Sequence, residues 1–218
     1  MSGQEVSIEA HGTRLDGDFD VPDGAHGLVV FTRRNGRVAA AMRAGGMGTL
    51  VLDLVTPELR FDVDRLATRL EVATEWVMSL PECSSLPIAF FGTSTGAAAA
   101  LITAAHLDDL VAAIVSCGGR PDLAGQYLPR VTAPTLLIVG ERDTPVLELN
   151  REAYLHMRCT RSLIVVPRAT HHFEEPGAME QAAALASGWL QQHIPAAVPH
   201  WVQHGAGYPA TDRRHAAR

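Results

Sequence analysis

The sequence contains no lysine, few cysteines and no long apolar run. All 18 basic side chains are arginines, which excludes a lysine general base or a lysine Schiff base. The three cysteines are odd in number and widely spaced. They therefore exclude a disulfide framework and a Cys-x-x-Cys zinc motif, and they favour a reducing, cytoplasmic environment. No stretch approaches the roughly 18 apolar residues of a membrane helix, and the first residues lack a signal-peptide pattern, so we expect no membrane association.

A basic excess is also missing, since 24 acidic residues against 18 basic ones give a net charge of −6. A nucleic-acid partner held by phosphate neutralisation is therefore not expected. The sequence has neither Gly-x-Gly-x-x-Gly nor a phosphate-binding Gly-x4-Gly-Lys-Ser/Thr loop, and we expect no cofactor. What is present is 47% apolar residues in a chain of 218, which is enough for the core of one domain.

The order of apolar runs and helical patterns predicts an α/β fold. Two alternating segments at the start predict an antiparallel hairpin, and the later short apolar runs are typical of strands buried on both faces of a parallel sheet. Helical patterns separate most of these runs. We therefore predict a three-layer sandwich with an eight-stranded, mostly parallel sheet whose first two strands are antiparallel. The predicted strands are residues 6–10, 14–21, 28–32, 49–53, 87–91, 111–116, 135–139 and 163–166, and the main predicted helices are 62–80, 96–107, 146–157 and 174–194.

The composition changes near residue 196. This change predicts a domain of residues 1–195 and a C-terminal tail of residues 196–218 that is loosely ordered or docked. The tail carries His200, His204 and His215, but neighbouring prolines and glycines disfavour a helix that would align them. We therefore expect no metal site.

The segment that carries chemistry is Gly92-Thr93-Ser94-Thr95-Gly96, between a predicted buried strand and a predicted small-residue helix. Gly-x-Ser-x-Gly in this context predicts a nucleophile elbow, a strained turn that presents the serine hydroxyl above the carboxyl end of the sheet. The helix N-terminus and the Thr95 N–H would stabilise negative charge there. The alternative is a glycine-rich turn with an inert serine.

A nucleophilic serine needs a base, and the base needs an orienting carboxylate. Asp143 follows the predicted strand 135–139, and His171 and His172 follow the predicted strand 163–166. The chain order Ser, Asp, His is the one that α/β-hydrolases use. We predict His171 as the base, with His172 as the alternative. Asp143 has two alternative roles, as a helix cap or as a charge partner of Arg142.

These motifs resemble the α/β-hydrolase superfamily, and in particular its small members near the dienelactone hydrolases. The resemblance rests on segments 91–97, 119–123, 134–143 and 169–177, and it covers roughly residues 27–190. It implies an α/β-hydrolase fold without a cap domain, with Ser94 as nucleophile, Asp143 as acid and His171 as base. Dienelactone hydrolases use a cysteine nucleophile, so their substrate does not carry over to a chain with serine at this position.

A second departure concerns the oxyanion hole. Relatives usually have a longer loop after the third strand, often with His-Gly, that supplies a second N–H donor. Here the strand passes through Thr32 and Arg33 almost directly into a predicted helix. We expect the backbone of Thr32 or Arg33 to provide that donor beside Thr95. Loss of one oxyanion donor lowers the rate by about 10²–10³-fold.

The surroundings of the site predict an open pocket. The 18 residues 117–134 are too short, and too rich in glycine and proline, to form a helical lid. Arg120 follows a strand end and is a candidate for binding an anionic substrate. An ion pair with Asp122 is the alternative for its side chain.

The sequence thus predicts a cofactor-free serine hydrolase that cleaves a small ester or thioester. Acyl transfer to an alcohol or amine shares the same acyl-enzyme and stays open. The alternative from another class is a non-catalytic binding or assembly protein with an impaired oxyanion site. The exposed edges of an open sheet favour a homodimer.

Overall fold

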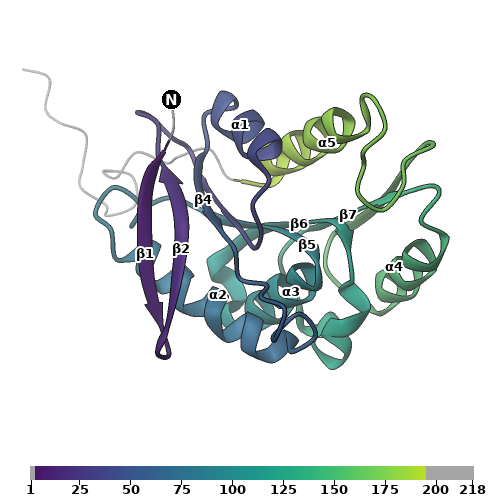
Figure 1. Ribbon diagram of the computed structural model, residues 1–218, viewed down its shortest axis with the longest axis horizontal. Coiled ribbons are helices and arrows are strands. Elements are labelled where there is room, and N and C mark those ends of the chain that lie inside the picture. Colours follow the sequence, from purple (N-terminus) through teal and green to yellow (C-terminus); the bar gives the residue numbers. More distant parts are fainter. Residues whose placement is uncertain (1–2, 195–218) are drawn as a thin grey trace, which may run out of the picture.

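The computed structural model describes residues 3–194, which form an eight-stranded sheet between two layers of helices (Figure 1). The predicted tail of residues 196–218 lies outside the described residues. The strands are β1 (Gln4–Ala10), β2 (Thr13–Asp20), β3 (Leu28–Phe31), β4 (Gly48–Leu52), β5 (Ile88–Ser94), β6 (Val111–Gly119), β7 (Thr135–Gly140) and β8 (Arg161–Val166). The α-helices are α1 (Gly36–Ala44), α2 (Val63–Met78), α3 (Thr95–Leu107), α4 (Thr144–His156) and α5 (Ala178–His193).

The strand order is β1-β2-β4-β3-β5-β6-β7-β8. β2 is antiparallel to both β1 and β4, and the remaining pairs are parallel, as predicted. Helices α1 and α5 cover one face of the sheet, and α2, α3 and α4 cover the other (Figure 1). Because all the parallel strands run the same way, their carboxyl ends meet at one edge, where the chemistry-bearing residues follow them.

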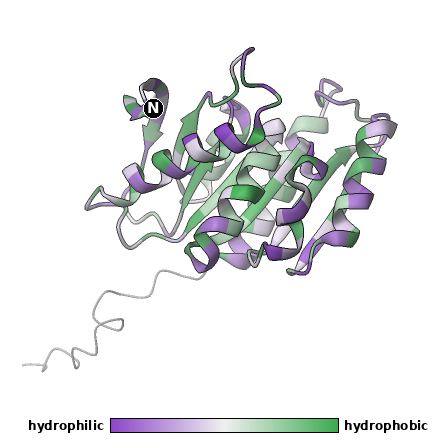
Figure 2. Ribbon diagram, turned by 90° about the horizontal axis from the view of Figure 1, so that it is seen from below, coloured by the Kyte–Doolittle hydropathy of each residue, from purple (hydrophilic) through white to green (hydrophobic). Residues whose placement is uncertain are grey.

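Each face of the sheet has its own apolar core. Side chains from α1 and α5 pack with Val29, Phe31 and Phe91 on one face, and α2 and α3 pack with Val30 and Phe90 on the other. Helix α3 is apolar around its whole circumference, and residues 95–105 are buried, as expected for a helix enclosed by other elements. Figure 2 shows this arrangement, with apolar residues on the strands and polar residues on the outer surfaces of the helices.

Local signals explain where the helices begin. The Asp62 carboxylate accepts a hydrogen bond from the Arg65 N–H at 3.1 Å, and the Asn35 side chain caps α1 through the Val38 N–H at 3.2 Å. Helix α5 begins at Ala178, four residues later than the predicted start at residue 174. Gly177, at φ 80°, takes the left-handed conformation and stops the helix from extending towards its N-terminal side.

The segment between β6 and β7 also differs from the prediction of a plain loop. It forms a 3-10 segment, η2 (Pro121–Arg130), which is interrupted at Gly125, where φ is 46°. A shorter turn, η1 (Asp108–Leu110), links α3 to β6. Within residues 3–194 no cap domain is inserted, and no helix is both long and apolar enough to cross a bilayer.

Candidate active site

The turn between β5 and α3 places Ser94 in a strained backbone conformation. Ser94 has φ 49° and ψ −133°, a region that side-chain-bearing residues rarely adopt. The flanking glycines make this turn possible. A Cβ at Gly92 would lie 2.5 Å from Ala97 Cα, and a Cβ at Gly96 would collide with the Thr32 hydroxyl. Glycine is therefore required at both positions, because β5, α3 and the residue after β3 pack closely there.

Asp143 and His171 form a short hydrogen bond across the carboxyl edge of the sheet. His171 Nδ1 lies 2.6 Å from Asp143 Oδ2, and the Asp143 side chain is only 12% exposed. Asp143 stands at the N-cap position of α4, but its side chain makes no capping bond, so its carboxylate is directed at the imidazole. An Nδ1–H that donates to Asp143 leaves Nε2 of His171 as the proton acceptor.

The neighbouring His172 is exposed and lies edge-on to His171, with 4.7 Å between the ring centroids. Among the described residues it makes no hydrogen bond to a carboxylate. The sequence left two histidines as candidates for the base. The geometry favours His171 over His172.

Backbone contacts between two loops hold the Asp143–His171 pair in place. The Arg142 N–H donates to the Ala169 carbonyl at 2.9 Å, and Gly140 lies so close to the Ala169 carbonyl that a side chain would not fit. On the histidine loop the Thr170 N–H donates to the Glu175 carboxylate at 3.0 Å. This hydrogen bond is the main reason why the pKa of Glu175 lies below its usual value.

Ser94 and His171 line the same cavity, which has a volume of about 200 Å³. Cys117 and Phe173 lie at its inner end, where both are buried. Burial raises the pKa of the Cys117 thiol to about 12, so this group is not a second nucleophile near neutral pH. Cys117 is thus a small buried residue of the cavity wall.

The loop between β3 and α1 closes one side of the cavity and is the predicted source of an oxyanion donor. The Thr32 N–H donates to the Phe91 carbonyl at 3.1 Å as part of the sheet, so it is not free to bind an oxyanion. Arg33 lines the cavity, and its N–H has no acceptor within residues 3–194. Thr95 is the first residue of α3, and its N–H has no acceptor within the helix. Arg33 and Thr95 are the two remaining donor candidates.

The position of Arg120 does not fit the predicted role in substrate binding. Its guanidinium forms two hydrogen bonds with Asp122, at 2.8 and 2.7 Å, and Arg120 is not among the residues that line the Ser94 cavity. Its backbone has a role near the site, because the Arg120 N–H donates to the Ser94 carbonyl at 2.9 Å and fixes the elbow to β6.

Arg34, Asn35 and Met179 are among the cavity residues that were not predicted from the sequence. Arg34 forms an ion pair with Asp53 at 3.3 Å, and the Asn35 side chain reaches Met179 Sδ at 3.6 Å. Met179 lies on α5, far along the chain, and no local sequence signal could have placed it at the site. The run Arg33-Arg34-Asn35 did offer a signal. It follows the carboxyl end of β3, which lies at the same edge of the sheet as Ser94.

Among residues 3–194 no group of three or more His, Cys, Asp or Glu side chains is placed to hold a metal ion. The titratable groups of the Ser94 cavity are Arg33, Arg34, Cys117, His171 and His172, so its lining contains two cations and no carboxylate.

The eight-stranded sheet, the serine elbow and the Asp–His pair define an α/β-hydrolase fold with a candidate serine active site. Residues 51–194 match the model of the dienelactone hydrolase family, and the chain belongs to this family. A solved structure titled dienelactone hydrolase from Anabaena variabilis is 42% identical and covers 88% of this chain and 98% of its own, with a TM-score of 0.82. Est1E from Butyrivibrio proteoclasticus is 16% identical with a TM-score of 0.71, over 86% of this chain and 98% of its own, and it shows the fold alone.

A curated relative from Mycobacterium tuberculosis is 46% identical over 209 residues. It is named a putative phosphoribosyl transferase. The match covers 89% of this chain and 47% of the relative, so the chain spans about half the length of the curated relatives that it matches.

Proposed function

We propose that the chain is a serine hydrolase that cleaves a small ester or thioester through an acyl-enzyme on Ser94. The observation that carries this proposal is the 2.6 Å hydrogen bond between Asp143 and His171, made by a histidine that shares a cavity with Ser94. Membership in the dienelactone hydrolase family supports hydrolysis as the reaction class. The volume of about 200 Å³ supports a short acyl group.

In the first half of the reaction, Ser94 Oγ attacks the acyl carbon and His171 Nε2 takes the hydroxyl proton. The Asp143 carboxylate holds the imidazole tautomer and stabilises the imidazolium that forms. The N–H groups of Thr95 and Arg33 hold the oxyanion. The imidazolium then gives its proton to the leaving alcohol or thiol.

In the second half, His171 takes a proton from water, and the resulting nucleophile attacks the acyl-enzyme. Collapse of this second oxyanion releases the acid and returns the proton to Ser94. An alcohol or amine in place of water gives acyl transfer by the same steps. We place the water reaction first because the cavity is open to solvent and no helical lid is inserted within residues 3–194.

The charge of the cavity lining favours substrates that carry a negative charge. Arg33 is exposed and has no carboxylate partner within residues 3–194, whereas Arg34 is paired with Asp53. A single unpaired cation at the mouth raises the encounter rate and affinity for anionic esters over neutral ones.

The test is hydrolysis of p-nitrophenyl acetate by the wild type, by Ser94→Ala and by a matched control, Ser85→Ala. Ser85 is exposed and lies outside the Ser94 cavity. We expect turnover by the wild type and the control and loss of turnover in Ser94→Ala. Equal turnover in Ser94→Ala would remove the serine from the mechanism. Absence of turnover in a folded wild type would favour the non-catalytic binding protein.

The name of the curated relatives does not extend to this chain. Those proteins are about twice as long, and the match covers 47% of them. A transferase activity of the whole relative can belong to the half that has no counterpart here. The cytoplasm remains our proposal for the location of the chain, on the basis of its cysteine content.

A further inference from the structure

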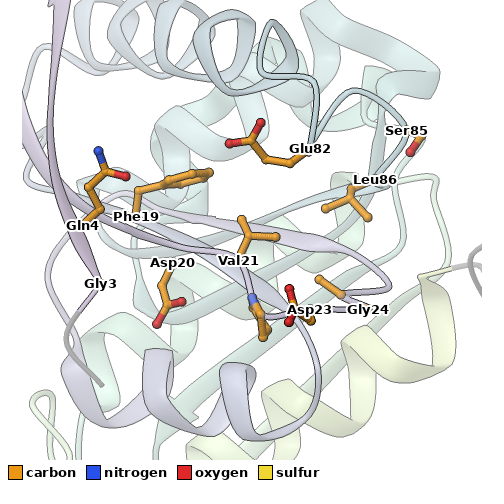
Figure 3. Close-up of a pocket in the computed structure, with 12 residues that line it drawn as sticks. Gly3, Gln4, Phe19, Asp20, Val21, Asp23, Gly24, Glu82, Ser85 and Leu86 are labelled. Carbon is orange, nitrogen blue, oxygen red and sulfur yellow. The ribbon is translucent and has the colours of Figure 1, made fainter.

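Figure 3 shows a second and larger cavity, of about 710 Å³. It lies at the opposite edge of the sheet from Ser94. Its walls come from the end of β2, the turn that follows β2, and the residues before β5. β2 runs antiparallel to β4, so its end lies beside the beginnings of the parallel strands. The proposed hydrolase site is at the other ends of these strands and takes no part in this cavity.

The cavity combines an apolar wall with unpaired negative charge. Phe19, Val21 and Leu86 supply the apolar part, and Glu82 lines the same cavity (Figure 3). Among residues 3–194, Glu82 and Asp23 have no ion-pair partner, and no arginine lines this cavity. The surface therefore fits a ligand with aromatic or aliphatic groups and positive charge.

The described part of the chain ends beside this cavity. Ile194 follows α5 and is 4% exposed, and its side chain packs against Gly27 next to the Pro87 carbonyl. Two residues of the cavity lining are close to these contacts along the chain. Ala25 precedes Gly27 by two residues, and Leu86 directly precedes Pro87. Ile194, the last residue that the structure describes, thus lies close to two segments that line the cavity.

The sequence that follows Ile194 contains aromatic and positively charged residues, which are complementary to the apolar wall and the carboxylates of the cavity. Residues 195–218 contain Trp201 and Tyr208, and they contain three arginines against one aspartate. Trp201 is seven residues beyond Ile194, which allows a reach of up to about 25 Å for extended chain. We propose that residues 195–218 dock in this cavity, with an aromatic side chain on the apolar wall and arginines facing Glu82 and Asp23.

Docking of this kind would tie the end of the chain to the β1–β2 hairpin. The hairpin contacts the body of the sheet mainly through the pairing of β2 with β4, over residues 17–20. A docked segment that bridges Phe19 and Leu86 adds a second connection between the hairpin and the parallel strands. It leaves the Ser94 cavity open at the opposite edge of the sheet.

The experiment uses the full chain with p-benzoylphenylalanine in place of Trp201. After irradiation, peptide mapping locates the cross-link. We expect a cross-link to the segments 19–25 or 82–86, with a yield that does not change over a hundredfold dilution of the protein. Cross-links that lie elsewhere, a missing cross-link, or a yield that falls with dilution would overturn the proposal, and the last result would indicate docking on a second copy.

Charge variants test whether the carboxylates hold the segment. Glu82→Arg should lower the cross-link yield at least fivefold, while Glu152→Arg, the same change at an exposed position on α4, should leave it unchanged. Equal yields in the two variants would refute the role of Glu82. Circular dichroism of each variant shows whether it is folded, and hydrolysis of p-nitrophenyl acetate should be equal in both, because neither residue lines the Ser94 cavity.

Discussion

The backbone strain at Ser94 can be measured as a difference in stability between two inactive variants. Ser94 has φ 49° and ψ −133°, where a side chain costs about 1–3 kcal/mol relative to a relaxed conformation. Ser94→Ala keeps a Cβ and keeps this strain. Ser94→Gly removes the strain but loses about 0.4–1 kcal/mol through the greater freedom of the unfolded chain. We therefore expect Ser94→Gly to be more stable than Ser94→Ala by about 1–2 kcal/mol.

The assay is urea unfolding of both variants, with thermal unfolding as a second readout. For a domain of this size 1 kcal/mol corresponds to about 2–4 °C, so Ser94→Gly should unfold about 2–8 °C above Ser94→Ala. The matched control is Thr93, the preceding strand residue, which does not have a positive φ. There the order should reverse, because glycine within a strand is less stable than alanine by about 0.5–1 kcal/mol. An alanine variant at position 94 as stable as the glycine variant would refute the strained elbow.

Three further predictions concern the Ser94 cavity. Asp143→Asn should lower kcat on p-nitrophenyl acetate on the order of 10⁴-fold, since the amide disfavours the required His171 tautomer, and a smaller than tenfold loss would contradict the triad. Arg33→Gln should lower kcat/KM for mono-p-nitrophenyl succinate about tenfold relative to p-nitrophenyl acetate; Arg37→Gln, which alters an exposed arginine paired with Glu180, should not change this ratio. The raised pKa of Cys117, about 12, keeps it protonated at pH 8, so iodoacetamide should leave it unmodified in the folded protein by peptide mass, and a Cys117 adduct would contradict its burial.

The fold could be predicted from the sequence because its signals are local and periodic. The eight strands lie close to their predicted ranges, since runs such as Leu136–Ile138 are buried on both faces of a parallel sheet and read as apolar throughout. The start of α5 was predicted four residues too early, because the left-handed conformation of Gly177 depends on the histidine loop and not on helical periodicity. The 3-10 segment η2 was missed because its short turns have no regular apolar period.

The candidate site was predictable where its residues follow strand ends. Ser94, Asp143 and His171 could be placed at one edge of the sheet because each follows a recognisable strand, and parallel strands end at the same edge. The role of Arg120 could not be judged, because the choice between a ligand and Asp122 depends on side-chain geometry. The prediction of the Thr32 N–H as an oxyanion donor was wrong, because its pairing with the Phe91 carbonyl depends on which strand lies beside β3.

The most direct test of the account is labelling of the full chain with a fluorophosphonate, read by intact mass and peptide mapping. Such probes react with a serine that a neighbouring base has activated, so the result depends on Ser94 and His171 acting together. We expect one adduct per chain, on Ser94, absent from Ser94→Ala and strongly reduced in Asp143→Asn. A folded wild-type protein that remains unlabelled, or an adduct on another residue, would contradict the assignment of Ser94 as an activated nucleophile.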